Sequence, residues 1–251
     1  MSDSIFPLKV MSFNIASGLR MDGHLDLALT ASVIEAADVD IAGLQEVDQH
    51  FSERTNFTDQ IKWLAKRLNM HAAFGPNLTA NPADARWPKH AYGNALLSRY
   101  PITSYYNHLL KKGESETQSE QRGLLEATIE IDGATISFFN THLSLNKKQL
   151  ELNIEELLNI IRQQDCPSIL TGDFNADPHS ALMRRIEEEL TNVFGSNTLQ
   201  PETYKKEGEH GQKIDFIFCS RHWRVVSAET IETQASDHKP ILALMELHPE
   251  A

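Results

Sequence analysis

The chain has 251 residues, 41% of them apolar, which is enough for one large domain or two small ones with a sizeable core. Its 35 acidic and 23 basic residues give a formal net charge of −12, which argues against a protein whose main task is binding nucleic acid. A nuclease is not excluded, because bound divalent cations and a local basic patch can reverse the field at one site. No run of eighteen apolar residues occurs, so no membrane span is expected.

The first predicted elements alternate between strands and amphipathic helices. Apolar residues recur at a helical period in residues 24–38, and Thr58 is the expected N-cap of the second helix. In chain order we expect a strand at 8–16, a helix at 24–38, a strand at 39–47, a helix at 57–70 and a strand at 93–102.

The central part of the chain predicts a β-hairpin. Residues 123–131 and 134–144 are apolar-rich and are separated by Asp132–Gly133, the strongest short hairpin signal. Further on we expect a helix at 146–163, a strand at 167–173, a short helix at 180–190, and strands at 213–220, 223–232 and 240–247. Strands joined partly by hairpins and partly by helices indicate mixed sheets covered by helices.

The chain shows no internal repeat and no linker long enough to divide it, so we expect a single domain over residues 1–251. The N-terminus lacks a basic segment followed by an apolar one, so it is not expected to be a secretory signal. Cys166 and Cys219 have no metal-type spacing, which favours buried free thiols in a reducing compartment and a cytoplasmic location.

Polar residues recur where predicted strands end or are interrupted. Ligands collect at strand ends in sheet-based enzymes, because a rigid scaffold meets solvent there. Carboxylate, amide and imidazole groups with few cysteines suit Mg²⁺, Mn²⁺ or Ca²⁺ better than a structural zinc. The residues concerned are Asn14, Glu46, Asn140, His142, Asp173, Asn175 and Asp215, together with Asp237 and His238 just before the last strand.

Each of these residues also has an ordinary structural interpretation. Asn14 can satisfy backbone groups at a strand end, and a buried His142 is more often a hydrogen-bonded core residue than a catalyst. Asp173 and Asn175 have period-two spacing, so in an extended backbone both project to the same side. Asp177 precedes a proline and is expected to form a turn. The joint occurrence of the set at strand ends is what favours a functional site.

Seven motifs carry a resemblance to a known group of enzymes. They occur in the order SFNI, LQEVD, YGNALLSRYPI, NTHLS, GDFNADP, KIDFIF and SDHKPI, and extend from about Lys9 to Leu247. This order is typical of the endonuclease/exonuclease/phosphatase superfamily, which the chain therefore resembles. The resemblance implies an α+β fold: a four-layer α/β/β/α sandwich of two mixed β-sheets packed face to face, with helices outside.

The resemblance also implies a reaction, the metal-assisted attack of water on a phosphorus ester. A divalent cation, Mg²⁺ or Mn²⁺, neutralises the anionic ester and polarises the P–O bond. Glu46 is then the principal metal ligand, with Asn14 and Asp237 as further metal-site residues. Asp173 orients or deprotonates the attacking water, and Asn175 donates a hydrogen bond to the nucleophile or to a phosphoryl oxygen.

Two histidines complete the catalytic set that the resemblance implies. His238 pairs with Asp215, which raises the pKa of the ring, and the pair serves as a general base or as an electrostatic stabiliser. His142 protonates the leaving oxygen, as in the deoxyribonuclease and sphingomyelinase branches. Abasic-site endonucleases carry a tyrosine at that position, so a dedicated abasic-site enzyme is disfavoured.

Arg122 and Asn94 are candidate substrate-binding residues. Arg122 precedes a predicted strand where some relatives contact phosphate, although a surface arginine in a charged loop is an equal alternative. Asn94 either orients His142 and lines the pocket or is a strand-end amide.

The substrate depends on two segments that we expect to be loops, 75–94 and 107–123. The first contains aromatic residues suited to stacking on a base or a sugar or to closing a rim, and the second shows no clear basic track. We therefore expect a phosphoester substrate, diester or monoester, and infer no protein partner.

Three alternatives to this function remain. One is a sphingomyelinase-like phosphodiesterase. A silent binding module is disfavoured by the complete set of catalytic residue types. A nuclease is favoured only if five basic residues gather on one rim of the site: Lys62, Lys66, Arg67, Lys89 and Arg99.

Overall fold

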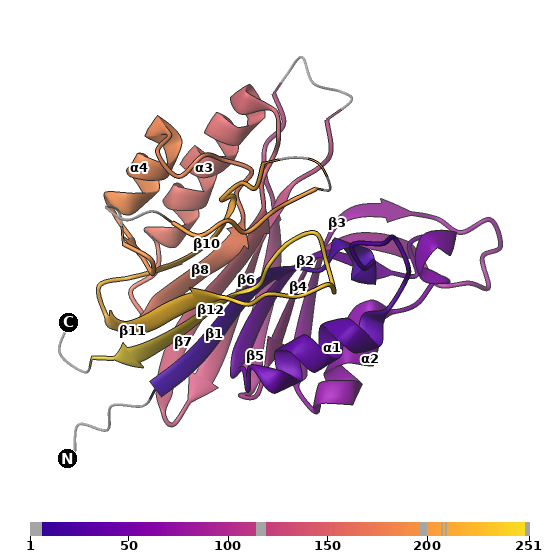
Figure 1. Cartoon of the computed structure of the whole chain (residues 1–251), viewed down its shortest axis with the longest axis horizontal. Helices are drawn as coiled ribbons and strands as arrows, with labels where there is room; N and C mark the ends of the chain where they lie inside the picture. Colours follow the sequence, from indigo (N-terminus) through magenta and orange to yellow (C-terminus); the bar gives the residue numbers. More distant parts are fainter. Residues whose placement is uncertain (1–6, 114–118, 196–199, 207, 209, 249–251) are drawn as a thin grey trace.

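The computed structural model describes residues 7–113, 119–195, 200–206, 208 and 210–248, which form two six-stranded sheets with helices on their outer faces (Figure 1). The first sheet has the order β11-β12-β1-β2-β4-β3. Its strands are β1 (Pro7–Asn14), β2 (Ile41–Gln49), β3 (His71–Ala80), β4 (His90–Ser98), β11 (Trp223–Thr230) and β12 (Ile241–Leu247).

The second sheet has the order β5-β6-β7-β8-β10-β9. Its strands are β5 (Ile102–Leu109), β6 (Gly123–Ile131), β7 (Ala134–His142), β8 (Ser168–Asp173), β9 (Thr191–Asn192) and β10 (Asp215–Cys219). Each sheet has one parallel pair, β1 with β2 and β7 with β8, and its other described pairs are antiparallel. A parallel pair needs a crossover, which helices α1 (Leu27–Ala36) and α3 (Lys147–Ile161) supply. The expectation of mixed sheets joined by hairpins and helices is confirmed.

The four α-helices of the described residues begin at capping side chains. Helix α2 (Gln60–Leu68) begins at Asp59, whose carboxylate accepts from the Lys62 N–H at 3.1 Å, so the prediction of Thr58 as N-cap is wrong by one residue. Asp26, Asn146 and Ser180 cap α1, α3 and α4 (Ala181–Glu187) in the same way. Two short 3₁₀ helices, η1 (Ala16–Gly18) and η2 (Glu53–Thr55), follow β1 and β2.

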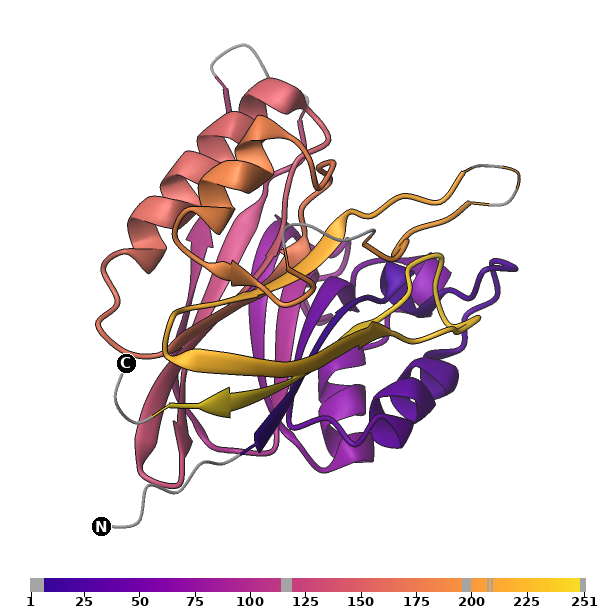
Figure 2. The ribbon, with the colours of Figure 1, turned by 60° about the vertical axis from the view of Figure 1, so that its left-hand side comes forward.

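The two sheets and the helices outside them form four layers (Figure 2). Three apolar cores fill the spaces between these layers. The inner core fills the space between the sheets, with residues such as Val10, Phe138 and Ile217. A second core packs α1 and α2 against the outer face of the first sheet, and a third packs α3 and α4 against that of the second. This arrangement confirms the expected α/β/β/α sandwich.

Two strands lie in segments that were expected to be loops. Segment 75–94 contains the second half of β3 and the start of β4, and 107–123 begins with the end of β5. Both missed strands lie at sheet edges and carry many polar or half-exposed residues, so their apolar alternation is weak. In the described part of the chain no helix is long and apolar enough to cross a membrane.

Candidate active site

The site forms where four strands bring polar side chains into the space between the sheets. Along β1, β7, β8 and β10, alternate residues face the inner core, and apolar side chains fill the middle of that layer. At one end the same alternation places a polar residue at each inward position: Asn14, His142, Asp173 and Asp215. Strand pairing brings three of them together, because Asp173 lies beside both His142 and Asp215.

Glu46 reaches this space because β2 is bulged. In the pairing of β2 with β4, Leu44 lies opposite Ala95 but Val47 lies opposite Gly93, so one extra residue is inserted. Glu46 adopts a φ of 57°, which is unusual for a residue with a side chain. The bulge changes the direction of its carboxylate, and Oε1 accepts a hydrogen bond from Asn14 Nδ2 at 3.1 Å.

Asp173 is the centre of the cluster. Its Oδ2 accepts from Asn14 Nδ2 at 3.1 Å and lies 3.5 Å from His142 Nε2 and 3.8 Å from His238 Nε2. Its Oδ1 accepts from the Asn175 N–H at 3.0 Å. The predicted residues Asn14, Glu46, His142, Asp173 and His238 therefore share one continuous network.

His238 and Asp215 form the predicted pair, with 2.9 Å between His238 Nδ1 and Asp215 Oδ2. Burial opposes the charged imidazolium, but the Asp215 carboxylate and the charges of Asp173 and Asp237 outweigh it and raise the pKa of His238 to about 10. His238 is therefore protonated at neutral pH in this arrangement.

The pKa values of Asp173 and His142 are also shifted from their usual ranges. Burial and the nearby Asp215 raise the pKa of Asp173 to about 7, although His238 and Asn14 act in the opposite direction. Burial, Arg122 and His238 hold the pKa of His142 well below its usual range. The expected role of His142 as proton donor to the leaving oxygen stays a prediction.

Asn175 does not lie as its spacing predicted. Strand β8 ends at Asp173, and Asn175 has a φ of 49°, so the backbone has already turned. The side-chain amide of Asn175 donates to the Leu143 carbonyl at 3.0 Å. Asp177 forms the expected turn, its carboxylate accepting from the His179 N–H.

Arg122 lies against the site, and Asn94 supports it from behind. Arg122 is 6% exposed, forms an ion pair with Glu120 at 2.8 Å and lowers the pKa of His142. Asn94 is fully buried and donates to the carbonyl of Gly123 at 3.0 Å, so it holds the residue next to Arg122. In this structure a substrate could reach Arg122 by displacing Glu120, whereas Asn94 acts through the backbone.

Asn140 does not belong to the site, although its position before His142 suggested it. Its amide nitrogen donates to the carbonyls of Leu44 at 2.8 Å and Ala95 at 2.9 Å, and its oxygen accepts from Gln45 and Thr171. Asn140 therefore joins the two sheets and has no free group for a ligand.

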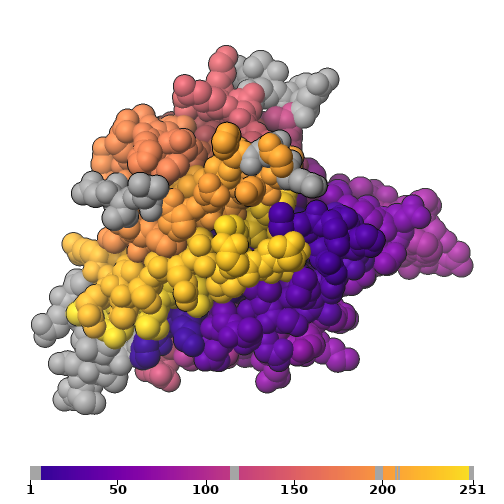
Figure 3. Space-filling view, in the orientation of Figure 1, coloured from indigo at the N-terminus to yellow at the C-terminus, as the bar shows by residue number. Residues whose placement is uncertain are grey.

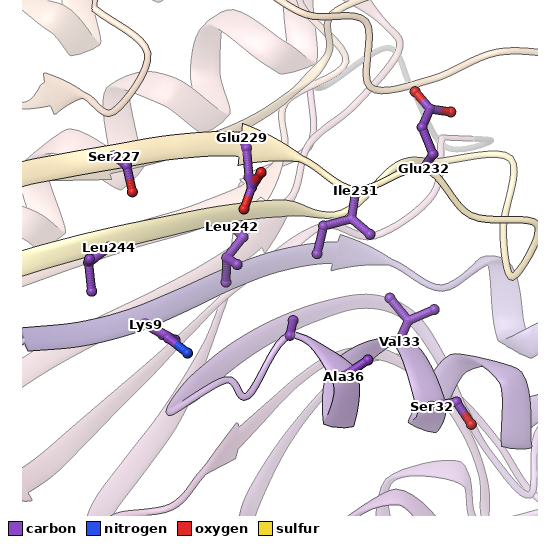
Figure 4. A pocket seen from close by; sticks show the side chains of 11 residues that line it. Lys9, Ser32, Val33, Ala36, Ser227, Glu229, Ile231, Glu232, Leu242 and Leu244 are labelled. Carbon is purple, nitrogen blue, oxygen red and sulfur yellow. The ribbon is translucent and has the colours of Figure 1, made fainter.

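Two hollows of similar size lie on the surface of the described residues. One, of about 770 Å³, borders Asp237 and is lined by Arg20, Met21 and Lys205, among others. The other, of about 640 Å³, lies between α1 and the neighbouring strands β11 and β12, where Val33 and Ala36 face Leu242 (Figure 4). It contains none of the candidate site residues, whereas the first hollow contains Asp237. The last strands, yellow in Figure 3, run across this view of the molecule beside the N-terminal segments.

Three site residues were missed at the sequence level. Ser236 Oγ donates to the Asn14 carbonyl at 2.8 Å and accepts from the His238 N–H at 3.1 Å, so it joins both ends of the site. Thr203 Oγ1 accepts from the Asp215 N–H at 3.1 Å, and the Tyr204 ring packs 4.7 Å from that of His238. Ser236 precedes the Asp–His motif and could have been found from it. Thr203 and Tyr204 have no such local signal.

The chemistry of the site fits a divalent cation. Within the described residues, ligand atoms of Asp173, Asp215 and His238 lie within 4.8 Å of one another and can hold a metal ion. Asp215 Oδ1 is buried and has no hydrogen-bond partner among the described residues. The sequence instead predicts the metal at Glu46, Asn14 and Asp237, of which Glu46 and Asn14 are in contact.

The basic residues that would mark a nucleic-acid track do not gather. Arg99 forms ion pairs with Asp38 and Asp40 at the start of β2, the end of the strand away from Glu46. Arg67 pairs with Glu35 across the two outer helices. The condition set for a nuclease is therefore not met.

Comparison with solved structures finds the same fold in other proteins. A structure described as an endonuclease/exonuclease/phosphatase from Beutenbergia cavernae superposes with a TM-score of 0.80 at 24% identity, over 96% of this chain and 72% of that one. The human Nocturnin catalytic domain gives a TM-score of 0.72 at 23% identity, over 96% and 93% of the two chains. A Bacteroides thetaiotaomicron mannosyl-6-phosphatase gives 0.70 at 19% identity, over 95% and 99%. These likenesses show the fold.

Proteins with similar sequences differ in length from one another. The uncharacterized protein YbhP of Escherichia coli K12 is 28% identical over 181 residues, which are 68% of this chain and 67% of that protein. Protein cwh43 of Schizosaccharomyces pombe is 29% identical over 155 residues, 59% of this chain but only 14% of that much longer protein. The sequence model of the endonuclease/exonuclease/phosphatase family matches residues 11–238. The chain thus belongs to the endonuclease/exonuclease/phosphatase family.

Proposed function

We propose that the protein is a phosphoesterase that uses Mg²⁺ or Mn²⁺ to hydrolyse a phosphodiester or phosphomonoester by in-line attack of water. The observation that supports this most is the network centred on Asp173, where two carboxylates, two imidazoles and an amide meet at one end of the inner layer. Members of the family are mostly metal-dependent phosphoesterases, in agreement with this set. We further propose that residues 1–251 act as one catalytic domain.

Glu46, with Asn14 and Asp237, would hold the metal, which when bound neutralises the ester and polarises its P–O bond. The oxygen donors of this set suit Mg²⁺ or Mn²⁺. A metal on Asp173, Asp215 and His238 would need the His238 ring, whose Nδ1 already lies 2.9 Å from Asp215 Oδ2. We therefore favour the Glu46 set.

The protein's own groups would handle the water and the developing charge. Asp173, with a pKa of about 7, is poised to accept a proton from the attacking water. The His238 imidazolium, fixed by Asp215, would stabilise the negative charge on the phosphoryl oxygens. Arg122 would bind a non-bridging oxygen once Glu120 has moved aside.

A panel of substrates tests this function. Bis-p-nitrophenyl phosphate, p-nitrophenyl phosphate, plasmid DNA and sphingomyelin would each be assayed with Mg²⁺, with Mn²⁺ and with EDTA. We expect metal-dependent hydrolysis that Glu46→Gln and His238→Gln reduce at least a hundredfold. Glu130→Gln and His222→Gln, which change residues outside the cluster, are matched controls. Activity in EDTA, or activity that survives both site substitutions, would refute the proposal.

The position of the metal can be tested without turnover. Isothermal titration of Mn²⁺ into the protein measures affinity directly. Glu46→Gln should weaken binding more than Asp215→Asn if the metal lies at the Glu46 set. The opposite order would place it at Asp173, Asp215 and His238.

A further inference from the structure

A second guanidinium lies at the rim of the site, close to Glu46. It belongs to Arg54, in the 3₁₀ helix η2 that follows β2. Its Nε donates to Asp48 Oδ2 at 3.2 Å and its Nη2 to Asp48 Oδ1 at 2.8 Å. Such a bidentate pair fixes the plane of the guanidinium as well as its position.

Asp48, the acceptor in this pair, is completely buried two residues after Glu46. Its carboxylate also accepts from Thr55 Oγ1 at 2.8 Å and Ser17 Oγ at 3.3 Å, and its N–H donates to Gln60 Oε1 at 2.9 Å. A buried carboxylate is stable only with so many donors, so the fold devotes several segments to holding Asp48 and, through it, Arg54.

Two aromatic rings fix the guanidinium from another side. The Arg54 Cζ lies 5.6 Å from the ring centres of both Phe51 and Tyr92, which are 5.4 Å from each other. The Arg54 side chain is nevertheless 41% exposed, and its Nη1 makes none of the hydrogen bonds found among the described residues. A preformed cation therefore presents one free edge to solvent.

Arg54 lies near Glu46, because its partner Asp48 follows Glu46 by two residues on β2. After the hydrogen bond to Asp48, the charges of Asp48, Tyr92 and Glu46 raise the pKa of Arg54. The charges that act on His142 are those of Arg122 and His238. Glu46, Arg54 and Arg122 all act on the pKa of Glu120, so Arg54 lies near both the candidate metal ligand and the ion pair of Glu120 with Arg122.

We propose that Arg54 binds a second anionic group of the substrate, a phosphate or carboxylate separate from the phosphoryl group that reacts. This inference rests on the proposed phosphoesterase function. Its physical basis is charge: Glu46, Asp173 and Asp237 repel an anionic substrate, and a fixed guanidinium beside them offsets that repulsion on one side only. Such a site would select phosphoesters that carry two anionic groups at a distance from each other.

A purely structural role for Arg54, closing the loop around η2, is the alternative. Arg67 provides the comparison, since it also makes a bidentate ion pair, with Glu35, but both partners are exposed and lie on the outer helices. Arg67→Gln is therefore the matched control for Arg54→Gln.

Competition against bis-p-nitrophenyl phosphate hydrolysis tests the inference, with free Mg²⁺ held constant. Glycerol 3-phosphate is compared with 3-phosphoglycerate, which adds a carboxylate, and fructose 6-phosphate with fructose 1,6-bisphosphate, which adds a phosphate. In wild type we expect the two-anion member of at least one pair to compete about tenfold better, equivalent to one charge-assisted hydrogen bond. The pair that responds identifies the second group.

The variants then decide whether Arg54 is responsible. Arg54→Gln should bring the ratio of competition strengths of the two members of a pair close to one. Arg54→Lys should keep part of the advantage of the two-anion member, and Arg67→Gln should keep all of it. A wild-type ratio near one in both pairs would overturn the inference even if Arg54→Gln failed to fold, and so would a ratio that Arg54→Gln leaves unchanged. If the wild-type protein showed no metal-dependent hydrolysis, the proposed function would be refuted instead.

Discussion

The amide nitrogen of Asn14 donates to two carboxylates at once, those of Glu46 and Asp173. One neutral side chain thereby holds two like charges near each other across the space between the sheets. Its carbonyl oxygen is also occupied, by the Ala16 N–H at 3.1 Å. The orientation of Asn14 is therefore fixed before any ligand arrives, which reduces the reorganisation needed during catalysis.

We expect Asp215 to be essential for turnover. We expect Asp215→Asn to lower kcat for the best substrate of the panel by on the order of 10²–10⁴, because an amide stabilises neither the charge nor the tautomer of His238. Asp177→Asn, which changes only a turn, is the control. Steady-state kinetics at pH 7 measure both variants, and an Asp215→Asn enzyme within tenfold of wild type would contradict the assigned pairing.

The same pair makes stability depend on pH. The pKa of His238 is raised from 6.5 to about 10, so the stabilisation is fully present below pH 6.5 and is lost as pH rises through 10. In EDTA, we expect the urea midpoint of wild type to fall more steeply between pH 6.5 and 10 than that of His238→Gln. Urea titrations at pH 6, 8 and 10 would show this, and parallel curves would count against it.

Asn140 shows how contacts between strands constrain the site. It lies on β7 two residues before His142, with the same inward orientation, yet it bonds across to β2 and β4. Gly43 of β2 leaves room for it, since a Cβ there would collide with Thr171 and Asn140. Strand β7 thus anchors the two sheets to each other two residues before His142.

Removing this link should destabilise the protein. Asn140→Ala removes the side-chain donor to the buried carbonyls of Leu44 and Ala95, at about 1–3 kcal/mol each. It also removes the nearest acceptor of the Gln45 amide, which keeps longer bonds to Ser12 and Gly43. We expect a loss of at least about 3 kcal/mol in the free energy of unfolding, measured by urea denaturation. Asn159→Ala on the exposed face of α3 is the control and should change it by less than about 0.5 kcal/mol.

The elements that could be predicted from the sequence were those with a strong local period or turn signal. The hairpin around Asp132–Gly133 and the helix at 146–163 are examples, and both occur close to the expected bounds. Strand β3 was not recognised in the sequence, because it has Gly75, Pro76 and Asn77 in its middle and such residues are rare in strands. Its pairing with β4 forms the strand despite these residues.

The site divides in the same way. The sequence motifs located Glu46, Asp173 and His238, although only Asp173 ends a strand. Strand β2 continues past Glu46 to Gln49, and His238 lies in the loop before β12. The separation of Asn140 from His142 could not be predicted, since it depends on which residues lie opposite on the other sheet. The link between Asp48 and Arg54 depends equally on the folded loop around η2.

Over the whole molecule, most of the site's charge is negative, as is the net charge of the chain. Mg²⁺ that binds only the folded state should therefore stabilise the entire fold. At a concentration about 100 times its Kd the gain is about 2.7 kcal/mol, or roughly 5–10 °C in Tm for a domain of this size. Differential scanning fluorimetry with and without Mg²⁺ measures it.

Two variants make this measurement specific. We expect Glu46→Gln to lose most of the shift and Glu130→Gln to keep it. A shift that is equal in all three proteins would indicate nonspecific binding of the cation to acidic surface groups.

Strands β1 and β12, the first and last of the described chain, are hydrogen-bonded neighbours inside one sheet. Asn14 at the end of β1 therefore meets Ser236 and His238 only when nearly all of the chain has been made. During synthesis on the ribosome, β1 must wait for its partner, and the nascent chain has no complete active site until β12 has emerged from the exit tunnel. The cluster around Asn14 and the first sheet are therefore completed together, when β12 pairs with β1.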